Sequence, residues 1–152
     1  MPVRRDDQAR PARRRDRTTL PLDAVGAALA ERVAGEVRFD AGSRAAYSTD
    51  ASNYRVLPLG VVVPRTPEDA VRTIEVCRAH DMPVLSRGGG TSLAGQCCNA
   101  AIVLDWSKYC DRVVSIDPAA RTAVVEPGIA LDRLNAALRP HGLMVGPKPA
   151  TM

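Results

Sequence analysis

Apolar residues recur along this chain with two periods, and their alternation predicts helices interleaved with short strands. Apolar positions three or four residues apart predict a helix that Asp23 caps and that continues to about Ala34, where Gly35 ends it. The same spacing predicts a helix over residues 130–138, which Pro140 ends.

A further helix is predicted between residues 66 and 80. Thr66 is expected to be its N-cap, Pro67 occupies the first helical position, and Asp69 completes a pair that resembles a capping box. His80 falls at the helix end, where capping explains it better than catalysis does. The inner face of this helix is predicted to carry the apolar residues Val71, Ile74 and Cys77.

Runs of β-branched and aliphatic residues predict short strands between the helices. The predicted strands cover residues 61–63, 83–86, 101–106, 113–116 and 122–126. The first two are expected to be buried, and Trp106 is expected to belong to the core. Asp117-Pro118 favours a turn between the last two strands.

The strand predicted at residues 83–86 runs directly into three consecutive glycines, and this loop is the most informative feature of the sequence. Glycine adopts positive φ without strain and has no Cβ, so successive backbone N–H groups can turn toward one point. A concave row of such donors binds anions, commonly a phosphate or diphosphate. Arg87 adds positive charge at the start of the loop, and the Thr91 and Ser92 hydroxyls add donors. The pattern favours a loop that holds the diphosphate of a nucleotide.

Two better-known phosphate loops do not match this segment. A Rossmann fingerprint requires a third glycine at the position where this chain has Leu93. A P-loop read from Gly90 reaches Gly95 at the right spacing, but Gln96 and Cys97 then replace the required Lys and Ser or Thr. A glycine-rich turn with a purely structural role is the alternative that the loop alone leaves open.

Motifs on both sides of the glycine loop occur in a particular order. The runs YSTDASNYR (47–55), SRGGGTSLAGQCCN (86–99) and VVEPG (124–128) follow one another at a characteristic spacing. In this order, over about residues 43–151, the chain resembles the FAD-linked oxidases of the p-cresol methylhydroxylase (PCMH) and vanillyl-alcohol oxidase superfamily. It is most similar to the D-lactate, glycolate and D-2-hydroxyglutarate dehydrogenase branch, including large members with an added iron–sulfur domain.

The resemblance implies which residues bind FAD. The glycine loop matches the segment that wraps the FAD diphosphate, and the Pro-Gly pair of VVEPG matches a turn near the flavin. A second FAD-contacting segment begins at residue 147, where Lys148 replaces the family's acidic residue. The implied cofactor-binding residues are Arg87, Gly88, Gly89, Gly90, Thr91, Ser92, Leu93, Gly95, Gln96, Pro127, Gly128 and Pro149.

The resemblance also limits the chemistry expected of this chain. Some members attach FAD covalently to a histidine just after the glycines, and Thr91 stands there instead, so non-covalent binding is expected. No catalytic residue and no metal site is predicted. The four cysteines lack the spacing of a cluster and are expected to be reduced thiols, so any [4Fe-4S] cluster would belong to the missing C-terminal part.

The resemblance implies an α+β fold: the N-terminal part of a PCMH-type FAD-binding domain, over residues 20–152. A small, mostly parallel sheet with flanking helices should be followed by the start of a second, β-rich lobe. The implied whole enzyme oxidises a small D-2-hydroxy acid, such as D-lactate, by hydride transfer to flavin. Because the cap domain and most catalytic residues are missing, the chain is interpreted as an N-terminal fragment. The alternative is a stand-alone, non-catalytic FAD-binding module or an inactive remnant.

Charge and hydropathy separate the first residues from the rest. Residues 1–17 contain seven arginines and three aspartates, which account for the whole formal net charge of +4. Residues 1–19 are therefore predicted to be a disordered Arg-rich tail, and a solvated extension is favoured over a nucleic-acid arm. No apolar run approaches the roughly 18 residues of a membrane span. We expect a cytoplasmic protein, poorly soluble because strands 101–126 should expose a face that the missing lobe covers.

Overall fold

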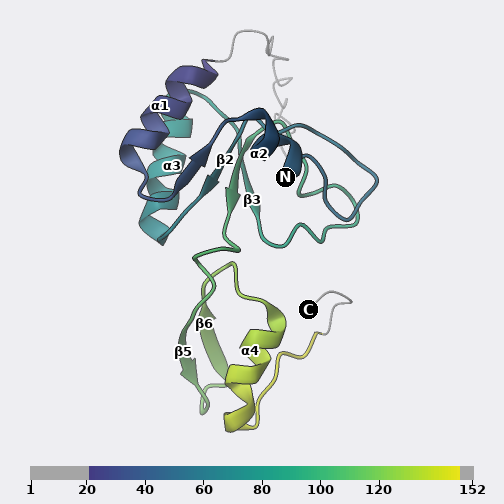
Figure 1. The fold of residues 1–152 in the computed structure, drawn as a ribbon. Helices are drawn as coiled ribbons and strands as arrows, with labels where there is room; N and C mark the ends of the chain where they lie inside the picture. The colour runs from purple at the N-terminus through teal and green to yellow at the C-terminus, as the bar shows by residue number, and fades with distance from the viewer. Residues whose placement is uncertain (1–20, 148–152) are drawn as a thin grey trace, which may run out of the picture.

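The computed structural model describes residues 21–147, which form two lobes joined end to end (Figure 1). The predicted tail at residues 1–19 and the predicted FAD contact at Pro149 lie outside the described residues. The first lobe contains a four-stranded sheet with helices, and the second contains a two-stranded hairpin with one helix.

The sheet of the first lobe has the strand order β1-β2-β4-β3. Strands β2 and β3 run parallel to β4, and only the edge strand β1 is antiparallel, to β2. The predicted small, mostly parallel sheet is confirmed. The elements of this lobe are α1 (Leu22–Arg32), β1 (Glu36–Arg38), α2 (Ala41–Ala46), β2 (Gly60–Val63), α3 (Pro67–Ala79), β3 (Val84–Arg87) and β4 (Ile102–Asp105).

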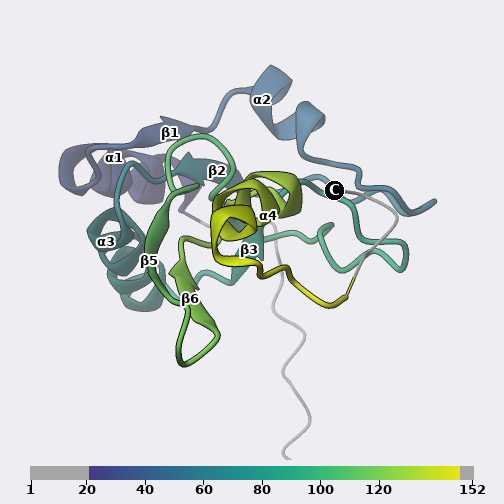
Figure 2. The same cartoon turned by 90° about the horizontal axis from the view of Figure 1, so that it is seen from below.

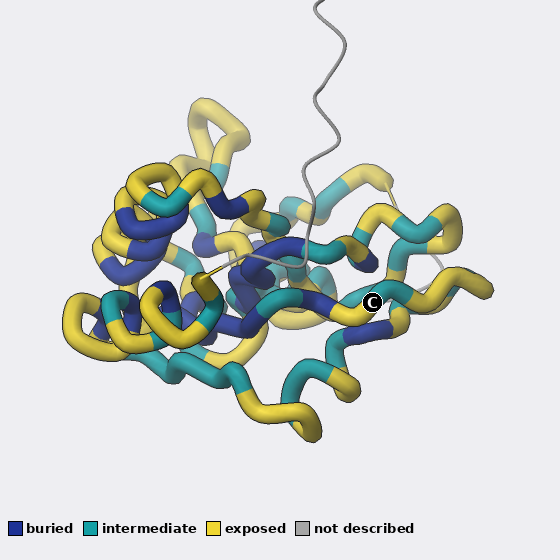
Figure 3. Tube along the Cα trace, turned by 90° about the horizontal axis from the view of Figure 1, so that it is seen from above, coloured by how far each residue is buried: buried dark blue, intermediate teal, exposed yellow. Residues whose placement is uncertain are grey.

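The core lies around the two central strands, β2 and β4, in which every residue is buried (Figure 3). Continuous apolar runs of this kind are typical of parallel strands covered on both faces. One face packs against α1 and α3 through Val62, Ile102 and Leu104. The opposite face, with Val61, Val63 and Val103, packs under partly buried side chains that include Tyr47 and Tyr109.

The start of α3 is confirmed, but Asp69 has a different role from the one predicted. Thr66 is the N-cap and Pro67 the first helical residue, and the Thr66 side chain makes no capping hydrogen bond. The buried Asp69 carboxylate instead accepts hydrogen bonds from the backbone N–H groups of Ala34 and Arg65, both at 3.0 Å. Asp69 therefore joins α3 to the turn after α1 and does not complete a capping box.

The buried face of α3 is rotated relative to the prediction. Cys77 is buried as expected, but Val71 and Ile74 are 56% and 50% exposed. The helix buries Ala70, Thr73 and Val76 in their place. Small residues suit this face because α3 packs closely against α1 and the sheet.

Several element boundaries and environments differ from expectation. Helix α1 begins at Leu22 after Pro21, so Asp23 lies in its first turn and is not the cap. Strand β3 is not buried as predicted: it is an edge strand, and Val84 and Ser86 are exposed. Trp106 is partly buried against the core, and its Nε1 donates to Ser86 Oγ at 2.8 Å. The short elements β1 and α2 were not predicted.

The second lobe consists of β5 (Val113–Asp117), β6 (Thr122–Val125), α4 (Leu131–Leu138) and the 3-10 turn η2 (Arg139–His141). The two strands form an antiparallel hairpin, as the predicted turn requires. Figure 2 shows the hairpin beside α4, both in front of the first lobe in this view from below. The strands of residues 101–126 were predicted to expose an apolar face. The hairpin does so at Val114 (62%) and Val124 (58%), whereas β4 is buried because it lies at the centre of the first sheet.

Candidate functional site

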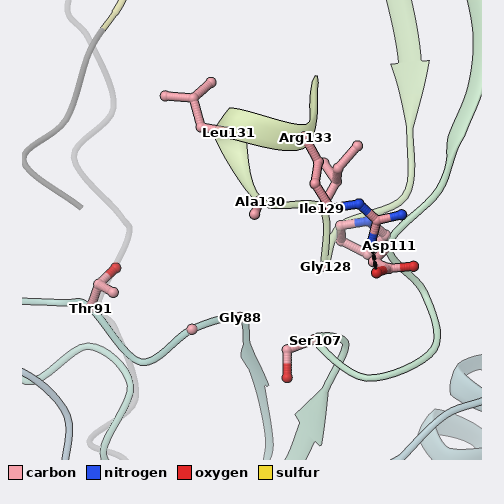
Figure 4. Close-up of a pocket in the computed structure, with 11 residues that line it drawn as sticks. Gly88, Thr91, Ser107, Asp111, Gly128, Ile129, Ala130, Leu131 and Arg133 are labelled. Carbon is pink, nitrogen blue, oxygen red and sulfur yellow. Dashed lines mark hydrogen bonds and ion pairs between the residues drawn. The ribbon is translucent and has the colours of Figure 1, made fainter. Parts of the chain in front are cut away.

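A pocket of about 360 Å³ lies between the two lobes (Figure 4). Its first wall is the glycine loop that follows β3, and its second wall is the segment from the end of β6 into α4. The turn after β4 closes the side between them. The lining residues are Gly88, Gly89, Thr91, Ser107, Asp111, Pro127, Gly128, Ile129, Ala130, Leu131 and Arg133.

The structure brings together two predicted motifs that lie far apart in the sequence. Gly88, Gly89 and Thr91 face Pro127 and Gly128 across the pocket. The other predicted residues of the glycine loop belong to the same loop but do not line this pocket: Arg87, Gly90, Ser92, Leu93, Gly95 and Gln96.

The glycine loop is rich in backbone donors without protein partners. Within the described part of the chain, no backbone N–H group of residues 88–96 donates to another residue. A Cβ added at Gly88 would meet nothing within 4 Å, and one added at Gly89 would meet only the Thr91 methyl group, at 3.6 Å. The fold therefore does not require glycine at 88 or 89, although both residues border the pocket.

Arg87 braces the loop from the side away from the pocket. Its guanidinium donates to the carbonyl oxygens of Thr49 and Cys97, both at 2.9 Å, and lies 5.4 Å from the centre of the Tyr47 ring. Gly90 has a φ of +68°, and a Cβ there would lie 2.4 Å from Arg87 Nη2. The arginine and the glycine are thus fitted to each other, and this contact fixes the curvature of the loop.

A second loop, residues 47–55, supports the glycine loop from behind. Asp50 Oδ1 accepts hydrogen bonds from Ser52, and Asp50 Oδ2 accepts one from the Cys97 N–H at 3.1 Å. The Ala51 N–H donates to the Gly90 carbonyl at 3.0 Å. Asp50 thus stabilises a turn, as its position in a polar loop favours, and also joins the two loops.

The wall opposite the glycine loop depends on close backbone contact at Gly128. Its N–H donates to the Cys110 carbonyl at 2.8 Å, and an added Cβ would lie 2.2 Å from the Trp106 carbonyl oxygen. Two residues earlier, the buried Glu126 accepts hydrogen bonds from the Arg112 backbone N–H (2.9 Å) and Nη2 (2.7 Å). The side-chain hydrogen bonds from Arg112 lower the pKa of Glu126. These contacts hold the strand end that carries Pro127 against the turn after β4.

Sequence analysis missed the pocket residues that follow β4. The Asp105 carboxylate accepts hydrogen bonds from the Ser107 N–H (2.9 Å) and hydroxyl (2.7 Å) and also from the Tyr47 hydroxyl (2.5 Å). Burial and the bond to Asp105 raise the pKa of Tyr47 to about 12. Ser107 and Asp111 follow the carboxyl end of a central parallel strand, and that position was the available signal.

Residues 21–147 contain neither a cluster of metal ligands nor a membrane-spanning helix. No three His, Cys, Asp or Glu residues gather there as a set of metal ligands. No helix in that range has the length and apolar character needed to cross a bilayer.

Comparison with known proteins identifies the family. The FAD binding domain family matches residues 58–152. D-2-hydroxyglutarate dehydrogenase of Pseudomonas putida is 34% identical over 120 residues, covering 77% of this chain and 12% of that protein. The mitochondrial D-lactate dehydrogenase [cytochrome] of Kluyveromyces lactis is 31% identical over 114 residues, covering 72% of this chain and 20% of the relative. The chain thus spans a small part of each relative's length.

The fold is found again in solved structures. The crystal structure of p-cresol methylhydroxylase with substrate bound superposes with a TM-score of 0.65 at 18% identity, covering 80% of this chain and 25% of that one. The predicted α+β fold of the PCMH type is confirmed by this likeness. With the pocket built from its two expected motifs, these findings show that the chain belongs to the FAD-binding domain family and forms part of such a domain.

Proposed function

We propose that the pocket between the lobes holds the diphosphate portion of FAD, within a flavin-dependent oxidoreductase that oxidises a D-2-hydroxy acid. The observation that carries the proposal is the convergence of the glycine loop and the Pro127-Gly128 turn on one pocket. Neither motif determines a ligand alone, but their meeting across two lobes is difficult to explain as local turn geometry.

The residues present suit a diphosphate. The backbone donors of residues 88–96 have no partner among the described residues, and oriented N–H groups in a concave loop attract anions. The segment that leads into α4, residues 129–131, forms the other wall, and the positive end of a helix dipole favours the same charge. Gly88 and Gly89 leave open the space that larger side chains would occupy.

The size of the pocket agrees with a partial site. Small-molecule sites enclose about 300–1,000 Å³, and this pocket of about 360 Å³ lies near the lower end. A dinucleotide as large as FAD would extend beyond it. This chain would therefore hold the phosphates and their neighbouring groups, and other parts of a longer protein would enclose the remainder.

The proposed reaction belongs to the whole enzyme. The names of the two relatives refer to D-2-hydroxyglutarate and D-lactate, which share a D-2-hydroxy acid group. FAD, when bound, would accept the hydride from the α-carbon of such a substrate. The residues of this chain would bind and orient the cofactor through backbone N–H groups, and the substrate contacts would lie elsewhere.

The binding is proposed to be non-covalent. Thr91 lines the pocket, and no histidine, cysteine or tyrosine is among the described lining residues. The Thr91 and Ser107 hydroxyls, which do line it, would contact a bound phosphate through hydrogen bonds. Flavin released intact by denaturation would agree with this assignment.

Titration with FAD tests the proposed site. Gly89→Val should abolish binding, measured by quenching of flavin fluorescence, because its side chain would occupy diphosphate space. The control is Gly42→Val, at an exposed position in α2 outside the pocket, which should bind normally. Unchanged binding by Gly89→Val would show that the loop is structural only. Dye-linked oxidation of D- but not L-2-hydroxy acids by the protein that carries this chain would test the reaction.

A further inference from the structure

Two charged side chains of opposite sign line the pocket in the described part of the chain, Asp111 and Arg133. Arg133 lies in the first turn of α4 and reaches Asp111, in the turn after β4, through an ion pair that Figure 4 marks. An unpaired Asp111 would repel a phosphate. The Arg133 guanidinium neutralises that charge, so this wall can attract an anion only while Arg133 is present.

The other cations near the pocket are held by protein groups. Arg87 donates to two backbone carbonyls and does not line the pocket. Arg112 forms several hydrogen bonds with the buried Glu126, and Lys108 pairs with Glu36. None of these three can reach a ligand without giving up contacts that hold the fold together.

Arg133 differs because most of its donors remain available. One nitrogen, Nη1, contacts Asp111 Oδ2, while Nε and Nη2 have no partner among the described residues. The side chain is 61% exposed. A guanidinium has five N–H donors in a planar fork, so it can contact a carboxylate on one side and a phosphate on another.

We infer that Arg133 is the cationic side chain that recognises the diphosphate of the bound nucleotide, and that Asp111 is the positioning residue that orients its fork. This inference rests on the proposed function, since it assumes that FAD enters this pocket. It assigns the charged contact to α4 in the second lobe, whereas the glycine loop of the first lobe supplies neutral donors. Both lobes would then hold the same phosphates.

The test compares FAD affinities of the full chain by fluorescence titration at several salt concentrations. Arg133→Gln should weaken binding about tenfold or more, because a charge-assisted hydrogen bond is lost. It should also flatten the salt dependence, since one ionic contact disappears. Arg139→Gln, at the other end of α4 and outside this pocket, is the matched control and should change neither quantity. Arg133→Lys should recover part of the affinity.

The role of Asp111 is tested by coupling. Asp111→Asn should weaken binding less than Arg133→Gln does, and adding it to Arg133→Gln should cause no further loss. Tighter binding by Asp111→Asn would overturn the positioning role. Equal affinity and equal salt dependence of Arg133→Gln and Arg139→Gln would overturn the assignment of Arg133, with FAD binding itself intact. If the unsubstituted chain bound no FAD, the proposed function would fail, and this inference with it.

Discussion

At the residue scale, the glycines near the pocket are glycines for different physical reasons. Gly90 and Gly95 have positive φ values of 68° and 79°, which disfavour any side chain. Gly128 lies against backbone atoms of the turn after β4. Gly88 and Gly89 have no positive φ and have open surroundings, so the fold itself does not explain the absence of their side chains.

This difference predicts opposite effects of one added methyl group. Gly128→Ala should destabilise the chain by about 1–3 kcal/mol, because backbone atoms must shift to admit it. Gly88→Ala should change stability by less than about 0.5 kcal/mol, as exposed substitutions usually do. Urea unfolding of the two variants compares these values, and equal losses would contradict the structural distinction.

Glu36 predicts a pH dependence of stability. Its carboxylate accepts hydrogen bonds from Lys108 Nζ (2.5 Å) and the Tyr109 hydroxyl (2.6 Å), which with Arg38 lower its pKa from 4.5 to about 2. Because the folded-state pKa is lowered, the stabilisation is fully present above pH 4.5 and is lost as the pH falls toward 2.

Glu36→Gln should therefore flatten the fall of the thermal midpoint between pH 4.5 and 2. Glu31→Gln, on an exposed position of α1, serves as the control and should leave the pH profile unchanged. Identical profiles for Glu36→Gln and the unsubstituted chain would refute the proposed role of this ion-pair cluster.

At the element scale, the pattern of apolar residues predicted most elements but not the environment of each face. Both central strands were predicted correctly, because short continuous runs of β-branched residues favour a strand over a helix. In α3, Val71 and Ile74 were placed inside because they are apolar, yet the buried face contains Ala70 and Thr73. Close packing against α1 favours small side chains at these positions. A search for regularly spaced apolar residues ranks side chains by hydrophobicity and does not take their volume into account.

The rotated face of α3 gives a direct comparison of side-chain truncations. Leu29→Ala should destabilise the chain by about 2–5 kcal/mol, because Leu29 of α1 is fully buried in the main core. Ile74→Ala should cost less than about 0.5 kcal/mol, because half of that side chain is already exposed. Denaturant midpoints measure both; a large loss at Ile74 would support the face predicted from sequence.

The candidate site was predictable where the signal was local and was missed where it depended on folding. Three glycines after a strand indicated an anion loop, and a Pro-Gly pair was assigned to the same ligand only through the family resemblance. Asp111 had only its position after a central strand as a signal and Arg133 had none, because the two meet only after the hairpin returns α4 to the turn after β4. Arg87 was expected to supply charge, but the structure fixes its side chain to two backbone carbonyls.

At the scale of the whole molecule, both lobes leave large apolar side chains exposed. The first lobe encloses its sheet between helices and loops but exposes Leu93 at 81%, and the hairpin of the second lobe exposes Val114 and Val124. Met144, near the end of the described chain, is 68% exposed. Exposed apolar side chains favour association where they form a continuous surface.

We expect the chain to self-associate through the hairpin as its concentration rises. The double variant Val114→Lys/Val124→Lys should reduce association, measured by sedimentation velocity. Ser115→Lys adds charge to the same hairpin at an exposed polar position and should have a smaller effect. A monomeric unsubstituted chain at all concentrations would show that this surface is not adhesive.

The glycine loop has one more consequence, which concerns the order of folding and binding. β3 and β4 are parallel neighbours, so residues 88–101 must carry the chain back along the whole length of the strands. Such return paths need about a dozen residues or more and are usually helical. Here the return path contains the glycine loop, and strand pairing fixes both of its ends. The entropy cost of closing the loop is therefore incurred when the sheet forms and not when a ligand binds. A ligand needs to order only the middle of the loop.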